Sequence, residues 1–142
     1  MLLLFVGNFQ RDLITRFKRL NTFTPEDYDT LVEVLKLFGN IVTTPNILTE
    51  VSNLSGELWD QMRNAYYGSF AQSLTFLNET YVPSTEVART PIFRALGITD
   101  AGIALIAREG LLVLTEDLTL YQYVLNNRID ALNFNHLRPW SA

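Results

Sequence analysis

The sequence predicts an α/β domain in which short parallel strands alternate with helices. Aliphatic or β-branched runs stand at residues 41–44, 111–115 and 131–134, and amphipathic segments with helical spacing separate them. The run at 111–115 is apolar almost throughout, as expected of a strand that is buried on both faces of a parallel sheet. With 142 residues, 48% of them hydrophobic, the chain suits one globular domain with its own core, and we expect a single domain over residues 1–142.

The first residues of the chain, 1–6, are all apolar, and a more polar stretch follows at 7–12. The run is too short to span a bilayer and lacks the basic start and cleavage pattern of a secretory leader, so we expect a cytoplasmic protein without a membrane segment. Phe9, Leu13 and Phe17 continue this run at helical spacing, which favours a helix over a strand.

Two Thr-Pro pairs mark the next helix starts, at residues 24–25 and 44–45. Each pair joins a hydroxyl N-cap to a proline at the first helical position. Apolar residues at helical spacing follow the first pair up to Phe38, and Gly39 is expected to end that helix. The β-branched run at 41–44 then predicts a strand between the two helices.

The second half of the chain shows the same alternation. Residues 58–78 carry apolar and aromatic side chains every three or four positions, which predicts a long amphipathic helix that the segment 81–84 breaks. A further helix is expected from Thr99 to Glu109, ended by Gly110, and another around Leu118 after the apolar strand. No repeat, low-complexity tract or linker marks a domain boundary.

Composition excludes several kinds of site. The chain has no Cys, which excludes disulfides, zinc-thiolate sites and thiol nucleophiles, and its single His136 excludes a multi-histidine metal site. Eleven Lys and Arg stand against fifteen Asp and Glu, so the net charge is −4. Nucleic-acid binding that relies on a broad positive field is therefore excluded, and a phosphate would have to be held locally.

Three carboxylates stand where they could serve a ligand site. Asp117 follows the apolar strand, and the carboxyl ends of parallel strands are where open α/β sheets bind ligands. Asp100 follows Thr99 at a helix start, and Glu50 flanks the apolar stripe of the helix that begins at 44–45. Each also has an ordinary interpretation. Asp117 could be a helix N-terminal acid, Asp100 a helix cap and Glu50 a solvated boundary residue. If the three converged, they would repel one another unless a hard cation such as Mg²⁺ or Mn²⁺ held them together.

Residues 42–53, 96–101 and 112–120 together resemble the PIN-domain family of metal-dependent ribonucleases. The three motifs occur in that family's order and on the expected elements, and the resemblance runs over essentially the whole chain. Each motif is short, so it is the ordered set that is specific. The resemblance implies a PIN-like three-layer α/β domain, whose central, mainly parallel sheet is flanked by helices.

The same resemblance implies a chemistry and the residues that carry it. Glu50, Asp100 and Asp117 match the family's catalytic, metal-binding acids, which hold Mg²⁺ or Mn²⁺ for hydrolysis of single-stranded RNA. Thr99, Thr115 and Asn53 match positions that support the metal site in that family.

One part of the family pattern has no counterpart here, because the family's first strand and its Asp would precede residues 1–6. We expect that this strand is missing; the alternative is that residues 1–6 form it, with Gly7-Asn8 in place of the acidic turn. Loss of the Asp is expected to weaken metal binding and catalysis. Two functions therefore stay open, an endoribonuclease and a catalytically incomplete domain that binds RNA or protein. Family precedent adds a toxin of a toxin–antitoxin pair, with an antitoxin and a second copy of the chain as further partners.

Overall fold

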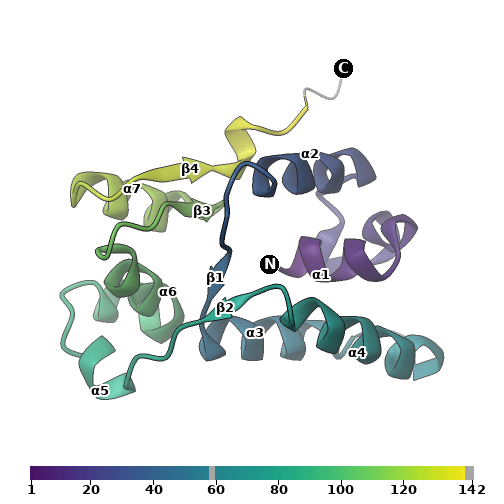
Figure 1. The fold of residues 1–142 in the computed structure, drawn as a ribbon, viewed down its shortest axis with the longest axis horizontal. Helices are drawn as coiled ribbons and strands as arrows, with labels where there is room; N and C mark the ends of the chain where they lie inside the picture. Colours follow the sequence, from purple (N-terminus) through teal and green to yellow (C-terminus); the bar gives the residue numbers. More distant parts are fainter. Residues whose placement is uncertain (58–59, 140–142) are drawn as a thin grey trace. The chain divides into compact units, whose positions relative to one another are not determined.

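The structure is a computed structural model that describes residues 1–57 and 60–139 (Figure 1). The chain divides into two compact units, and each is described by itself. The N-terminal unit comprises Met1–Thr43, Ile47–Glu79 and Pro139, and the C-terminal unit comprises Thr44–Asn46 and Thr80–Arg138. Helices and short parallel strands occur in both units, which agrees with the α/β class.

The N-terminal unit is mostly helical. Its elements are α1 (Leu2–Phe9), the 3₁₀ helices η1 (Arg11–Arg16) and η2 (Lys18–Leu20), α2 (Pro25–Leu35), β1 (Val42–Thr43), most of α3 (Pro45–Ser55), α4 (Asp60–Leu74) and β2 (Asn78–Glu79). The expected helix at the start of the chain is confirmed as α1, so the alternative of a strand there is wrong. It ends before Gln10, whose backbone is extended, and the helical spacing of the following residues belongs to η1.

α1 lies between α2 and α4 (Figure 1). The contact with α2 depends on Gly7, because a methyl group at this position would overlap the ring of Tyr28. Next to it, the Tyr28 hydroxyl donates a hydrogen bond of 2.7 Å to Oδ1 of Asn8. Gly7 and Asn8 are thus helical packing residues, and they do not form a turn in place of the family's acid.

The expected start of α2 is confirmed in detail. The Thr24 hydroxyl accepts a hydrogen bond of 3.2 Å from the Asp27 amide, and the Asp27 carboxylate accepts one of 2.8 Å from the Thr24 amide. This reciprocal arrangement is a capping box, which satisfies two amides that the helix start would leave unpaired. The helix ends at Leu35, earlier than expected, because tight turns take the chain through Phe38.

β1 and β2 form a parallel pair, with Val42 opposite Asn78 and Thr43 opposite Glu79. The sequence did not predict β2, and it instead placed residue 78 at the end of a long helix. Both residues of β2 are polar and exposed, so they carry no hydrophobic alternation. The pairing is made by the backbone, through an Asn78 amide that donates to the Ile41 carbonyl at 2.8 Å. The expected start of that long helix, at residue 58, lies outside the described residues.

Aromatic rings from α1 and α4 fill the interior of the N-terminal unit. Phe5 packs against Phe70 with ring centroids 4.4 Å apart, and Tyr66 meets the edge of Phe9 at 5.6 Å. The hydroxyls of Tyr66 and Ser55 are 2.6 Å apart, so the buried phenol has a hydrogen-bond partner. Burial raises the pKa of Tyr66 above its usual value, although the bond to Ser55 opposes this shift.

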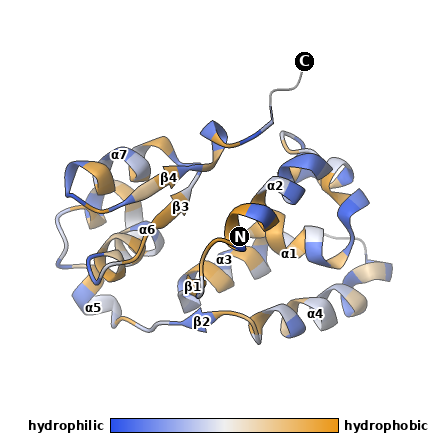
Figure 2. Ribbon diagram, turned by 45° about the horizontal axis from the view of Figure 1, so that its top comes forward, coloured by the Kyte–Doolittle hydropathy of each residue, from blue (hydrophilic) through white to orange (hydrophobic). Residues whose placement is uncertain are grey.

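The C-terminal unit contains a second parallel pair of strands. Its elements are α5 (Ser84–Val87), α6 (Phe93–Ala107), β3 (Val113–Thr115), α7 (Leu118–Asn126), β4 (Ala131–Asn133) and the 3₁₀ helix η3 (Phe134–His136). Both expected strands are confirmed, and Figure 2 colours them largely as hydrophobic. β3 is shorter than the apolar run that predicted it, because pairing with β4 begins only at Val113.

α6 packs against α5 and α7 through small side chains. Ala101, Ala104 and Ala107 are buried along it, in one cluster with the aliphatic residues of β3 and α7. The helix is interrupted at Gly97, whose φ of 81° is readily adopted only by glycine. The helical stretch that follows contains Thr99 and Asp100 at its start, close to the predicted position.

The strands of the described residues thus form two separate parallel pairs, β1–β2 and β3–β4, rather than one continuous sheet. In the C-terminal unit, α7 packs against both β3 and β4. None of the helices within residues 1–57 and 60–139 combines the length and the apolar character that a membrane crossing requires.

Candidate functional site

The carboxyl ends of β3 and β4 meet at one edge of their parallel pair. β3 ends at Thr115 and β4 ends at Asn133, and these two residues are paired in register. Asp117 follows two positions after Thr115 and begins α7. Ligands of parallel α/β sheets are typically held at this kind of edge, so the prediction for Asp117 placed it correctly in the fold.

Asp117 also has a structural task. Its Oδ1 accepts a hydrogen bond of 2.8 Å from the Leu120 amide, which makes it the N-cap of α7. Its own amide donates a hydrogen bond of 3.0 Å to the Thr115 hydroxyl. The ordinary alternative for Asp117, a helix N-terminal acid, is therefore confirmed. The cap engages one carboxylate oxygen of an exposed side chain, so it does not by itself exclude a ligand.

Asn133, at the end of β4, hydrogen-bonds to the turn that follows this strand. Its side chain is only 5% exposed, and its Oδ1 accepts a hydrogen bond of 3.0 Å from the Asn135 amide. Asn135 in turn donates from Nδ2 to the Glu116 carbonyl, at 3.5 Å. The Asn135 side chain thus links the turn after β4 to the loop after β3.

The other predicted residues lie on helices. Asp100 and Thr99 are half-buried at the start of the second stretch of α6, in the same unit as Asp117. Glu50 and Asn53 are exposed residues of α3 in the N-terminal unit. The structure therefore assigns two of the three predicted acids, with both supporting threonines, to one compact unit.

Oxygen donors of these types suit Mg²⁺ or Mn²⁺ in chemistry. Within residues 1–57 and 60–139, however, no group of three or more Asp, Glu or His side chains is arranged to hold a metal. Mg²⁺ commonly takes only one or two carboxylates and completes its octahedron with water and substrate phosphates. The donors of the C-terminal unit thus fit such a cation by type, and not as a preassembled cage.

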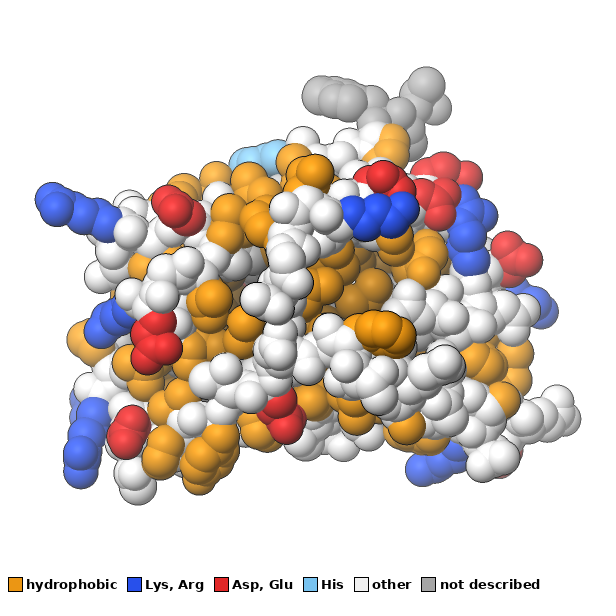
Figure 3. All heavy atoms as spheres, in the orientation of Figure 1, with side chains coloured by type: hydrophobic (Ala, Val, Ile, Leu, Met, Phe, Trp, Pro, Cys, Tyr) orange, Lys and Arg blue, Asp and Glu red, His pale blue; other side chains and the backbone are white. Residues whose placement is uncertain are grey.

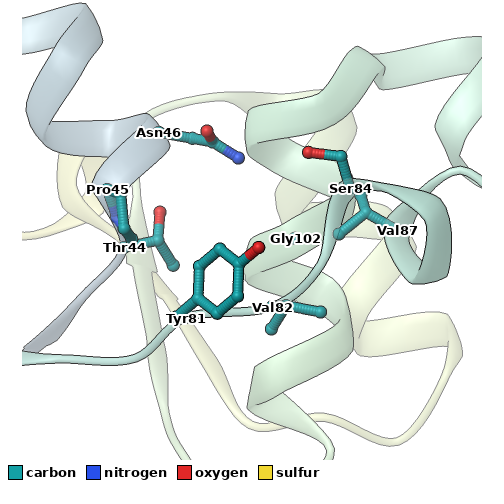
Figure 4. Close-up of a pocket in the computed structure, with 8 residues that line it drawn as sticks. All are labelled: Thr44, Pro45, Asn46, Tyr81, Val82, Ser84, Val87 and Gly102. Carbon is teal, nitrogen blue, oxygen red and sulfur yellow. The ribbon is translucent and has the colours of Figure 1, made fainter.

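A small pocket in the C-terminal unit was not predicted (Figure 4). In Figure 4 the Asn46 amide and the Ser84 hydroxyl point toward one another, and the Tyr81 ring lies beside them. The sequence showed a helix start at 44–45 and a helix break at 81–84, but not that the two segments meet. The pocket is lined by Thr44, Pro45, Asn46, Tyr81, Val82, Ser84, Val87 and Gly102.

Charged side chains do not gather into a basic surface on the face that Figure 3 draws. Lys and Arg stand there singly or beside Asp and Glu. Within the N-terminal unit, for example, Arg11 pairs with Asp29 and Arg19 with Glu57. On that face, the distribution agrees with the net charge of −4.

Comparison with known proteins gives no relative from which a function could be taken, since no family model, no curated protein and no solved structure matches the sequence significantly.

Proposed function

We propose that this chain is a PIN-like, metal-dependent endoribonuclease that hydrolyses phosphodiester bonds of single-stranded RNA. The observation that carries the proposal is the position of Asp117 at the carboxyl end of the parallel pair β3–β4, in one compact unit with Asp100. Acids at this edge are well placed to serve a ligand in parallel α/β folds. The three motifs that resemble the PIN family include both acids.

Some of the chain's own groups would bind the metal ion, and others would position those ligands. Asp117 and Asp100 would hold Mg²⁺ or Mn²⁺ through carboxylate oxygens, and the Thr115 hydroxyl fixes the backbone on which Asp117 sits. When bound, the cation would supply a Lewis acid that orients the phosphodiester and offsets the charge that develops on it. RNA would then be held without a basic surface, in keeping with the acidic composition.

The proposal extends to two further features of the resemblance. Glu50, which belongs to the other unit, stays a metal ligand implied by the resemblance alone, and its substitution tests that role independently of Asp117. The three-layer arrangement of the PIN family is the corresponding fold, of which β3 and β4, with α6 and α7, would be one part.

The decisive experiment is Mn²⁺-dependent cleavage of a labelled, largely unstructured RNA by the full chain and its variants. Asp117→Asn is the informative change, because asparagine caps a helix about as well as aspartate but removes the charge. We expect Asp117→Asn and Asp100→Asn to lower cleavage by about a hundredfold or more, with folding intact. Asp130→Asn, at an exposed acid of the same unit that the resemblance does not assign, is the matched control.

The same samples give a direct measure of metal binding by calorimetric titration with Mn²⁺. Weaker Mn²⁺ binding in Asp117→Asn, with normal binding in Asp130→Asn, supports the proposal. Cleavage that is unchanged in both Asp117→Asn and Asp100→Asn would mean that a contaminating nuclease or another site is responsible, and the enzyme proposal would fail.

A second candidate is a PIN-like domain that binds RNA or protein without turnover. It is favoured by the cap that Asp117 forms and by the lack of a group of three metal ligands in the described part of the chain. A folded protein that binds RNA in Mn²⁺ but leaves it intact would select this candidate. For a toxin of a toxin–antitoxin pair, a neighbouring reading frame that encodes a small DNA-binding protein is the corresponding test.

A further inference from the structure

We propose that the pocket at the start of α3 binds one unstacked nucleobase of single-stranded RNA, with Tyr81 as the surface on which the base stacks. The inference deepens the proposed function and rests on it, because it names how the substrate strand is held. The pocket lies within the C-terminal unit, and its lining contains neither Asp100 nor Asp117. It would therefore be a binding subsite apart from those two acids.

Tyr81 is the first part of this subsite. Its side chain is 74% exposed although it lines the pocket, so most of the ring is open to solvent. Figure 4 shows the ring at the pocket with its hydroxyl directed inward. An exposed aromatic ring of this kind is what proteins use to stack an unpaired base, and stacking tolerates any of the four bases.

Polar groups that could read the edge of a base stand beside the ring. The Asn46 amide offers both donors and an acceptor, and the Ser84 hydroxyl can donate or accept. In Figure 4 both point into the space next to Tyr81. Donors and acceptors in one place match the mixed hydrogen-bonding edge of a nucleobase.

The pocket lining determines which part of a nucleotide would enter. None of the eight lining residues carries a charge, so a phosphate would find no counter-charge there. The pocket is small, which suits the edge of one flat ring better than a whole nucleotide. Gly102 leaves space in the wall, because an added Cβ would reach only Val87, at 3.9 Å. A phenylalanine ring of a protein partner would fit the space but would leave the Asn46 amide and the Ser84 hydroxyl without a hydrogen-bond partner from the ligand.

The test measures binding without catalysis. Fluorescence anisotropy follows a fluorescein-labelled oligouridylate titrated with the full chain in EDTA, so that no divalent cation takes part. We expect Tyr81→Ala to weaken binding by about five- to a hundredfold, since that is the range for loss of one stacked base. Tyr81→Phe should bind within about twofold of the original chain, because it keeps the ring face. Gly102→Leu should weaken binding by filling the pocket.

Phe76→Ala is the matched control, because Phe76 is 76% exposed and belongs to the other unit. Unchanged affinity in this variant, together with loss in Tyr81→Ala and Gly102→Leu, supports the inference. Equal losses in Phe76→Ala and Tyr81→Ala would show nonspecific contact with exposed rings and overturn it. Affinity that survives both pocket substitutions would overturn it as well.

Two further readouts identify the ligand. Titration with free uridine or adenosine should shift the amide NMR signals of Asn46, Ser84 and Gly102 and should not do so in Tyr81→Ala. If an aromatic peptide shifts these signals and the nucleosides do not, the pocket is a protein-binding site and the inference is wrong. Loss of cleavage in Asp117→Asn with unchanged RNA binding in EDTA concerns the proposed function alone, so the two failures are distinguishable.

Discussion

The two units of this protein are built around different kinds of side chain. The N-terminal unit packs large rings from α1 and α4 against one another, with Phe5 and Phe70 in contact and Tyr66 fully buried. The C-terminal unit packs small and aliphatic residues, with alanines along α6 against β3 and α7. The predicted metal ligands Asp100 and Asp117 and the pocket all belong to the second unit. Aromatic packing therefore characterises one unit, and packing of small and aliphatic side chains characterises the unit that carries most of the candidate site.

If rings hold the N-terminal unit together, truncating one of them should have the largest effect on stability. We expect Phe5→Ala to lower the free energy of unfolding by about 3–5 kcal/mol, because the 1% exposed ring leaves a cavity against Phe70. Hydrogen exchange of the α1 and α4 amides measures the effect. Phe76→Ala, which removes an exposed ring, should stay within about 0.5 kcal/mol of the original chain. Similar losses in both variants would contradict the comparison.

In the C-terminal unit, we expect the opposite change, from a small side chain to a large one, to lower stability. Ala104 is 2% exposed in α6, and Ala104→Leu should lower the free energy of unfolding by about 1–3 kcal/mol through overpacking. Ala95→Leu introduces the same side chain at an exposed position of α6 and should be nearly neutral. Urea unfolding followed by circular dichroism compares the two. An Ala104→Leu variant as stable as Ala95→Leu would show that α6 does not need small residues.

The smallest expected effect is electrostatic and lies on the surface of the N-terminal unit. The Arg11 guanidinium donates hydrogen bonds of 2.9 and 2.6 Å to Asp29 and lowers the pKa of that carboxyl below its ordinary value. Because the folded state holds the proton less tightly than the unfolded state, this pair contributes stability above the ordinary pKa. The contribution disappears as the pH falls through the lower, folded pKa.

NMR titration of the Asp29 carboxyl measures the shift directly. Urea unfolding across the same acid range should show a slightly weaker pH dependence in Asp29→Asn, since the pair is exposed and screened. A carboxyl that titrates at its ordinary value in the original chain would rule out the contribution.

Local chemistry accounts for the parts of the fold that the sequence predicted well. Thr24-Pro25 predicted the start of α2 because capping depends on residues within one turn, and the capping box is formed as expected. The helix after Asp117 follows the same rule, because Asp117 caps α7, and α3 begins at Pro45 as the second Thr-Pro pair predicted. The strand β2 was missed because its two polar residues carry no pattern, and its pairing with β1 is made by the backbone across a long stretch of sequence.

The candidate site was predictable only in part, for the same reason. Asp117 was placed correctly because it directly follows an apolar strand, and its cap was expected as an alternative. The pocket could not be predicted, because Asn46 and Tyr81 are far apart in the chain and each looked like an ordinary helix start or break. Periodicity reports which face of an element is apolar, but not which elements meet.

The sequence by itself determined the α/β class, most helix starts, the two apolar strands and the chemical types of the candidate ligands. These follow from spacing, capping and composition, which act over a few residues. Only the tertiary structure decided that the strands of the described residues form two parallel pairs, that Gly7 must leave room for the ring of Tyr28, and that Tyr81 and Asn46 share a pocket. Those features depend on contacts between distant segments, whose formation is governed by packing and burial of the whole unit rather than by any local pattern.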